Sequence, residues 1–314
     1  MKITMIGDTM VGKTTFMMST YGLMQGENVT GFSLKCKDEG AHNRLIRAYN
    51  DFRAIGKYPP ATVQMDEYEY DFYNGNDWVM KYSLVDIRGE SIHDYDVNAL
   101  LRQLKDSQAM ILFLNGYDIV NGEDVSDQID DIYMLMNNSF ITSQKQKLIM
   151  VIFSQCDRIA DFGEETLKRL MEPVEELKTM ADKSNNVNFV AVPTACSLDC
   201  MMDLDYAMAG LMYFGYTTDL IERHNYIEAE LESIKRQYGD GLFRGILDFL
   251  GLDYERDAAR ARASVLQGQI DEFNAMVPKF EKLKKFVDDY ELGTHYRIKR
   301  LYSSAAANEN AWGI

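Results

Sequence analysis

The sequence predicts an α/β protein with a mostly parallel sheet, one antiparallel hairpin strand, flanking helices and an all-helical C-terminal extension. Three observations support this fold class. Short apolar runs alternate with longer segments of helical period, a glycine-rich turn follows the first run, and strand-like runs end by about residue 222. Strands that are buried on both faces of a parallel sheet have continuous apolar runs of this kind.

Four apolar runs have the length of buried strands: residues 2–6, 109–114, 148–153 and 187–192. Segments of helical period lie between them at residues 14–24, 97–104, 125–136 and 164–180. This alternation indicates helical crossovers between parallel strands. Residues 62–73 and 77–86 also resemble strands, and Asn74-Gly75 between them suits a tight hairpin turn. We therefore expect one antiparallel pair at the edge of the sheet.

The C-terminal third has helical rather than strand-like patterning, and we expect helices over 226–238, 242–252 and 255–290. Pro278 predicts a kink or two consecutive helices. Bulky aromatic residues along the last helix favour an intramolecular helical hairpin, although a coiled coil with another chain stays open. These patterns divide the chain into a domain over 1–222, a helical domain over 223–300 and a tail over 301–314, which we expect to be disordered.

Composition excludes several classes of function. The 314 residues include 33 Lys and Arg against 49 Asp and Glu, a net charge of −16, which disfavours nucleic acid as a partner. No apolar run is long enough to cross a membrane, and the N-terminus has no signal-peptide pattern, so we expect a cytoplasmic protein. The segment 241–250 is amphipathic but poor in bases, so we expect it to pack internally rather than on a membrane. The four cysteines lack a zinc-site spacing and are expected to be reduced thiols.

The first turn carries the motif Gly7-Asp8-Thr9-Met10-Val11-Gly12-Lys13-Thr14, a strand-preceded and helix-followed G-x-x-x-x-G-K-[ST]. Backbone N–H groups of such a loop bind polyphosphate together with the N-terminus of the helix. The lysine of such a loop reaches the β- and γ-phosphates, and its threonine hydroxyl binds Mg²⁺. The nucleotide-binding residues expected here are Gly7, Asp8, Thr9, Met10, Val11, Gly12, Lys13, Thr14 and Thr15.

Two segments around the hairpin suit the γ-phosphate and the metal. Asp86 ends the second hairpin strand, where its carboxylate can hold Mg²⁺, and the N–H of Gly89 can meet the γ-phosphate. Thr62, after Tyr58-Pro59-Pro60, has the hydroxyl best placed to reach both. The metal ligands expected are therefore Thr14, Thr62 and Asp86, and the groups expected at the reacting phosphate are Lys13, Thr62, Gly89 and Glu90.

The ends of the last two strands suit a purine base. Ser154-Gln155-Cys156-Asp157 follows one strand, and the Asp157 carboxylate can accept both N–H groups of guanine. Ala195-Cys196 follows the next strand and can offer a backbone N–H to guanine O6. Adenine presents the opposite donor and acceptor pattern. We therefore expect Gln155, Asp157, Ala195 and Cys196 at a guanine site.

In order and spacing, these motifs resemble the Ras-like small GTPases of the translation-factor-related class. The opening motif is similar to the Rab branch, and Pro-Pro-x-Thr with Asp-x-x-Gly-Glu resembles the bacterial double-GTPase families. The resemblance covers residues 1–222. It implies GTP or GDP with Mg²⁺ at Lys13 and Thr14, a γ-phosphate sensor at Thr62, a second switch at Asp86 and Gly89, and guanine reading by Asp157 with Ala195.

Three departures from the family pattern predict altered behaviour. Ser154 and Gln155 replace the usual Asn-Lys at the start of the base loop (residues 154–157). The replacement removes the Asn amide that braces this loop and the Lys side chain that covers the base. Glu90 replaces the water-positioning Gln, which predicts slow hydrolysis. Thr9 and Met10 leave less room for an external arginine finger, and Arg47, Arg53 and Arg88 are internal candidates that we interpret as solvated surface arginines.

The resulting hypothesis is a GTP-binding switch that hydrolyses GTP slowly and signals to an unidentified protein effector or activator. Its loops over 57–62 and 86–96 would respond to the γ-phosphate. Two alternatives stay open: a hydrolysis-deficient nucleotide-binding scaffold, and, less favoured, a P-loop ATPase or small-molecule kinase. A homo-oligomer is also an open alternative.

Overall fold

The computed structural model describes residues 1–25, 31–60, 66–87, 97–247 and 254–289. The chain divides into two compact units: the first contains Met1–Leu211 and the residues from Asp289 onward, and the second is Met212–Asp288. The division falls inside helix α8 (Leu204–Leu247), as does the boundary at residue 222 that the sequence indicates. The expected tail over 301–314 lies outside the described residues.

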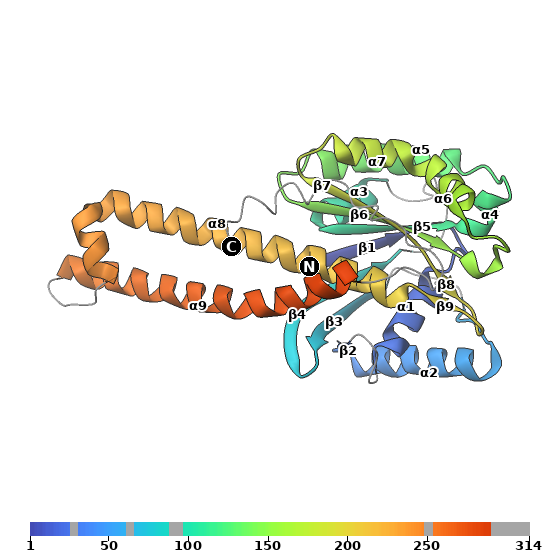
Figure 1. The fold of residues 1–314 in the computed structure, drawn as a ribbon, viewed down its shortest axis with the longest axis horizontal. Helices are drawn as coiled ribbons and strands as arrows, with labels where there is room; N and C mark the ends of the chain where they lie inside the picture. Colours follow the sequence, from blue (N-terminus) through green and yellow to red (C-terminus); the bar gives the residue numbers. More distant parts are fainter. Residues whose placement is uncertain (26–30, 61–65, 88–96, 248–253, 290–314) are drawn as a thin grey trace. The chain divides into compact units, whose positions relative to one another are not determined.

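The first unit is built on a seven-stranded sheet in the order β2-β3-β4-β1-β5-β6-β7 (Figure 1). The strands are β1 (Lys2–Ile6), β2 (Phe32–Cys36), β3 (Asp66–Asn74), β4 (Asp77–Asp86), β5 (Ala109–Asn115), β6 (Lys147–Ser154) and β7 (Val187–Pro193). Within this sheet only β3 runs antiparallel to its neighbours. The predicted mostly parallel sheet with one antiparallel hairpin strand is therefore confirmed, including the turn at Gly75, whose φ is 58°.

Helices cover both faces of this sheet (Figure 1). The helices of the first unit are α1 (Lys13–Leu23), α2 (Glu39–Ile55), α3 (Val97–Asp106), α4 (Gly116–Val120), α5 (Ser126–Met136), α6 (Glu164–Met171) and α7 (Glu175–Asp182). One extensive apolar cluster joins Leu112 of β5 to Leu104 of α3 and Ile132 of α5. The next residue of β5, Phe113, contacts Phe16 of α1 on the opposite face. Because β5 is buried on both sides, its sequence is apolar without interruption.

The segment β2–α2 is absent from the sequence-based expectation, and it corrects the predicted edge of the sheet. β2 pairs with β3, so the hairpin is flanked rather than exposed. The signals for these elements are present but short. Phe32 and Leu34 alternate with more exposed residues in a five-residue strand, Asp38 caps α2 by accepting from the N–H of Ala41, and Gly56 ends the helix at φ 69°.

Several predicted helices have different limits. The single helix expected over 164–180 is broken into α6, a 3₁₀ turn (Glu172–Val174) and α7, because Pro173 cannot donate a backbone hydrogen bond. A short π-helix (Asn137–Ile141) extends α5. A 3₁₀ turn (Cys156–Arg158) follows β6, and the two-residue strands β8 (Ala195–Cys196) and β9 (Met201–Met202) form a small hairpin after β7.

The second unit contains most of α8 and of α9 (Tyr254–Asp289), which form an antiparallel helical hairpin (Figure 1). The separate helices expected over 226–238 and 242–252 are wrong, because α8 is continuous to Leu247; residues 248–253 lie outside the described residues. α9 also continues through Pro278 as one helix. Ile227 and Leu266 are buried between the two helices, with Leu231, Ile270 and Phe273 packed against them. The chain therefore forms the intramolecular hairpin that the aromatic stripe favours.

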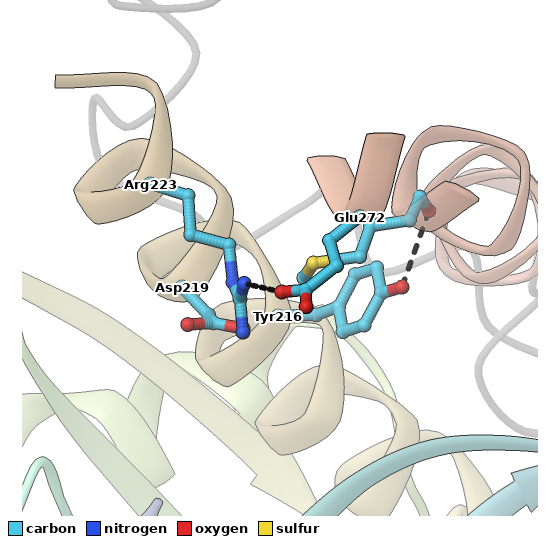
Figure 2. Close-up of polar contacts among 5 residues, drawn as sticks. Tyr216, Asp219, Arg223 and Glu272 are labelled. Carbon is cyan, nitrogen blue, oxygen red and sulfur yellow. Dashed lines mark hydrogen bonds and ion pairs between the residues drawn. The ribbon is translucent and has the colours of Figure 1, made fainter. Parts of the chain in front are cut away.

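Polar contacts add to this apolar seam (Figure 2). The Arg223 guanidinium lies 2.8 Å from the Glu272 carboxylate on α9 and 3.3 Å from Asp219 on its own helix. Tyr216 donates a hydrogen bond to the carbonyl oxygen of Met276 at 3.2 Å, and burial raises the pKa of Tyr216 to about 12. The hydroxyl therefore stays protonated and keeps this donor role across the neutral range. Within the described ranges, no helix combines the length and apolar composition needed to cross a bilayer.

Helix α1 has a close contact with α2 that glycine permits. A Cβ on Gly22 would overlap the ring of Tyr49, whereas a Cβ on Gly268 of α9 would meet nothing within 4 Å. We predict that Gly22→Ala lowers the free energy of unfolding by about 1–3 kcal/mol, because the ring must move. Gly268→Ala is the matched control and should be neutral or stabilising by up to about 1 kcal/mol. Denaturant titration followed by circular dichroism measures both, and equal stability of the two variants would contradict this packing.

Candidate functional site

The loop between β1 and α1 depends on two glycines. Gly7 has φ 151°, and a Cβ there would lie 2.6 Å from the carbonyl oxygen of Phe113. Gly12 has φ 95° and stands at the N-cap of α1 with no side-chain cap, and the first turn of α1 contains no acidic residue. An anion at this helix end would therefore meet favourable backbone dipoles and no carboxylate in that turn.

Lys13 is a buried cation in this loop, with 6% of its surface exposed. Its Nζ donates to the carbonyl oxygens of Gly7 at 2.6 Å and Asp8 at 3.0 Å. Burial lowers the pKa of Lys13, and the nearby carboxylates of Asp86 and Asp8 oppose this shift. Of the other predicted loop residues, Asp8, Thr9 and Met10 are exposed, Val11 is buried, and Thr14 and Thr15 are half-buried.

Two oxygen donors meet beside Lys13. The Thr14 hydroxyl lies 3.5 Å from the Asp86 carboxylate, and Asp86 is 1% exposed at the end of β4. Hard oxygen donors of this kind suit Mg²⁺, so the residues present fit this ion. The other predicted phosphate and metal residues, Thr62, Gly89 and Glu90, and the finger candidate Arg88, lie outside the described residues.

The loops after β6 and β7 are joined at the same edge of the sheet. Thr194 N–H donates to the carbonyl oxygen of Phe153 at 2.7 Å, and Cys156 N–H donates to that of Thr194 at 3.1 Å. Asp157 is exposed on the 3₁₀ turn, whereas Ala195 is fully buried. Burial raises the pKa of Cys156 and of Cys196 to about 12, so both stay protonated beside the exposed carboxylate.

The base loop remains connected to the phosphate loop although the Asn amide of the family pattern is absent. Ser154 Oγ lies 2.6 Å from the carbonyl oxygen of Val11, to which it donates, and 3.2 Å from that of Leu114. Gln155 Nε2 lies 3.4 Å from the carbonyl oxygen of Met10. Two side chains that depart from the family pattern therefore connect the base loop to the phosphate loop (residues 7–14).

Sequence reasoning missed one aromatic side chain at this site. Tyr58 is 54% exposed, and burial of the remainder raises its pKa, with smaller contributions from the nearby Asp157 carboxylate and Cys196. The only sequence signal was its place before Pro59-Pro60. Among the finger candidates, Arg47 is exposed, and Arg53 is exposed but donates to the carbonyl oxygen of Leu198 at 3.2 Å, beside β8.

The fold and this set of loops define a P-loop GTPase. A family model described as Double-GTPase 2 matches residues 2–195, which extends from β1 to β8. The chain belongs to this family, which agrees with the resemblance that the sequence motifs indicate. The family also implies guanine nucleotide as the bound nucleotide.

A comparison with solved structures found partial similarity to several proteins. The mammalian SRP receptor is 12% identical at a TM-score of 0.42, covering 68% of this chain and 100% of that chain. The small GTPase Arl6 of Trypanosoma brucei is 12% identical at 0.40, covering 70% and 97%. A probable GTP-binding protein, EngB, is 14% identical at 0.38, covering 68% and 98%. A search of curated proteins found no significant match.

The hydrogen bond from Ser154 to the phosphate loop should be measurable as stability. We predict that Ser154→Ala lowers the free energy of unfolding by about 1–2 kcal/mol, because the carbonyl oxygen of Val11 loses a buried donor. Ser264→Ala, at an exposed position of α9, should leave it within about 0.5 kcal/mol. Urea unfolding of both variants provides the comparison. If Ser154→Ala unfolds at the wild-type midpoint, Ser154 does not brace the loops.

Proposed function

We propose that this protein is a guanine-nucleotide switch that hydrolyses GTP slowly to GDP and phosphate in a Mg²⁺-dependent reaction. One observation carries the proposal: Ser154 and Gln155 connect the base loop, which carries the Asp157 carboxylate, to the phosphate loop, which contains the buried Lys13. One rigid edge of the sheet thus offers groups for both ends of a nucleoside triphosphate.

The phosphate end would be held by charge and by backbone donors. Lys13 Nζ, already oriented across the loop by two carbonyl oxygens, would bind the β- and γ-phosphates, and the N-terminus of α1 would add its dipole. Thr14 and Asp86 would hold Mg²⁺, with Thr62 as the third protein ligand. Mg²⁺ supplies positive charge against the negative charge of the phosphate oxygens.

The base end would be read by Asp157 and the backbone after β7. The Asp157 carboxylate would accept from guanine N1–H and N2–H, and the N–H of Ala195 or Cys196 would donate to O6. Tyr58 would provide an aromatic face for the purine, since its exposed ring lies near this carboxylate. Adenine would place an N–H₂ donor against a donor, so guanine should be preferred.

Hydrolysis needs little covalent chemistry from the protein. Positioning and charge stabilisation by Lys13 and backbone N–H groups, including that of Gly89, would lower the barrier. Glu90 would bring a carboxylate near an anionic γ-phosphate, which disfavours the attack of water. Loops over 57–62 and 86–96, with Thr62 and Gly89, would change with the γ-phosphate and signal to a protein effector or activator, together with the C-terminal hairpin.

Asp157→Asn tests the base assignment. The asparagine amide cannot accept from both guanine N–H groups, so we expect at least about a tenfold loss of GDP affinity and a gain for xanthine nucleotide, whose O2 can accept from the amide. Competition against fluorescent GDP by GDP, XDP and ADP measures this preference. Asp161→Asn, at an exposed acid nearby, is the control and should leave it unchanged. An unaltered guanine preference in Asp157→Asn would refute the assignment.

Glu90→Gln tests the proposed cause of slow turnover. Because the substitution removes a negative charge from the vicinity of the γ-phosphate, we expect single-turnover hydrolysis of radiolabelled GTP to rise about tenfold, which corresponds to a barrier lower by about 1.4 kcal/mol. Lys13→Ala should abolish hydrolysis. If wild type releases no phosphate with Mg²⁺ and Glu90→Gln also releases none, the hydrolysis-deficient scaffold is the better description.

A further inference from the structure

A series of contacts through the base loop, from Tyr117 to Met10, is not explained by the family pattern. The Arg158 guanidinium lies over the ring of Tyr117, 3.9 Å from its centroid. Arg158 Nη1 donates to Gln155 Oε1 at 2.6 Å, and Gln155 Nε2 faces the carbonyl oxygen of Met10 at 3.4 Å. The four residues therefore connect α4 through the base loop to the phosphate loop.

The hydrogen bond between the two loops joins residues with unfavourable backbone conformations. Met10 has φ 67° and Gln155 has φ 56°, and both are left-handed positions occupied by residues other than glycine. Such a conformation is strained for a residue that has a side chain, so neighbouring contacts must hold it. The bond from Arg158 to the Gln155 side chain is one contact that holds the base-loop end.

Tyr117, whose ring lies under the Arg158 guanidinium, is held in place by its own neighbours. Asn115, at the end of β5, caps α4 by accepting from the N–H groups of Tyr117 and Asp118. A Cβ on Gly116 would lie 3.1 Å from both Cys156 Sγ and the carbonyl oxygen of Ser154, so α4 lies close against the base loop. Tyr117 thus presents its ring from a short helix with little freedom to shift. The contact with this ring orients the Arg158 guanidinium.

We propose that Tyr117 and Arg158 are positioning residues that determine how long a nucleotide stays bound. They act through Gln155, whose amide they hold against the phosphate loop, rather than by touching the nucleotide. Release requires the base loop and the phosphate loop to separate, and the line from Tyr117 to Met10 opposes that separation. This inference rests on the proposed nucleotide site and adds a determinant of its exchange rate.

Dissociation of a fluorescent GDP analogue from the full-length protein tests the proposal. Arg158→Met retains the length of the side chain but removes the charge over the ring and the donor to Gln155. We expect its dissociation rate constant to rise about tenfold, equivalent to 1.4 kcal/mol. Tyr117→Leu should raise it in the same direction, whereas Tyr117→Phe keeps the ring face and should restore the wild-type rate. Arg102→Met, an exposed arginine on α3, is the matched control.

A double variant separates positioning from a general loss of structure. If Arg158 acts through Gln155, then Gln155→Ala/Arg158→Met should release the analogue no faster than Gln155→Ala alone. The melting temperatures of the nucleotide-free variants should stay close together. Additive effects, or a wild-type dissociation rate in Arg158→Met, would overturn the proposal. If wild type binds no guanine nucleotide at all, the proposed function fails first, so the two failures are distinguishable.

Discussion

The positive charge of Lys13, buried in the loop between β1 and α1, holds this loop in place at one end of the sheet. Lys13 is almost wholly buried, and desolvation lowers its pKa, so the charged form depends on what surrounds it. Two loop carbonyl oxygens accept from its ammonium group, and Asp86 supplies a carboxylate from β4, the strand that pairs with β1. Because removing one partner of a buried charge is costly, this turn has little freedom to rearrange.

Much of the fold could be predicted from local pattern. β1, β5, β6 and β7 are buried on both faces, so their apolar runs identified them, and the phosphate loop has fixed spacing within eight residues. β2 could not be recognised as easily, because a five-residue edge strand with an exposed Lys35 has few apolar positions. The continuity of α8 was also missed, since weak helical signals at its glycines gave no measure of the support that packing provides.

The candidate site divides in the same way. Lys13, Thr14, Asp86 and Asp157 could be named as candidates from the sequence, because their chemistry is contained in short motifs. The roles of Ser154, Tyr58 and Arg158 could not, since each depends on a partner far along the chain or on an adjacent loop. The substitution of Asn by Ser in the base loop illustrates the point. By sequence it removes a brace, but in the structure the smaller hydroxyl reaches the phosphate loop directly.

Helix α2 gives this protein a further connection between its loops. Its N-terminal half contacts α1 through the hydrogen bond between Tyr21 and His42, and Arg53 near its end reaches the loop after β8. The chain then continues through Tyr58 towards Thr62.

Calorimetric titration of the protein with GDP, and separately with ADP, in the presence of Mg²⁺ tests the central claim most directly. One GDP site that Lys13→Ala removes, with no comparable ADP binding, is the predicted result. The absence of a binding heat with GDP, or equal binding of both nucleotides, would contradict this claim.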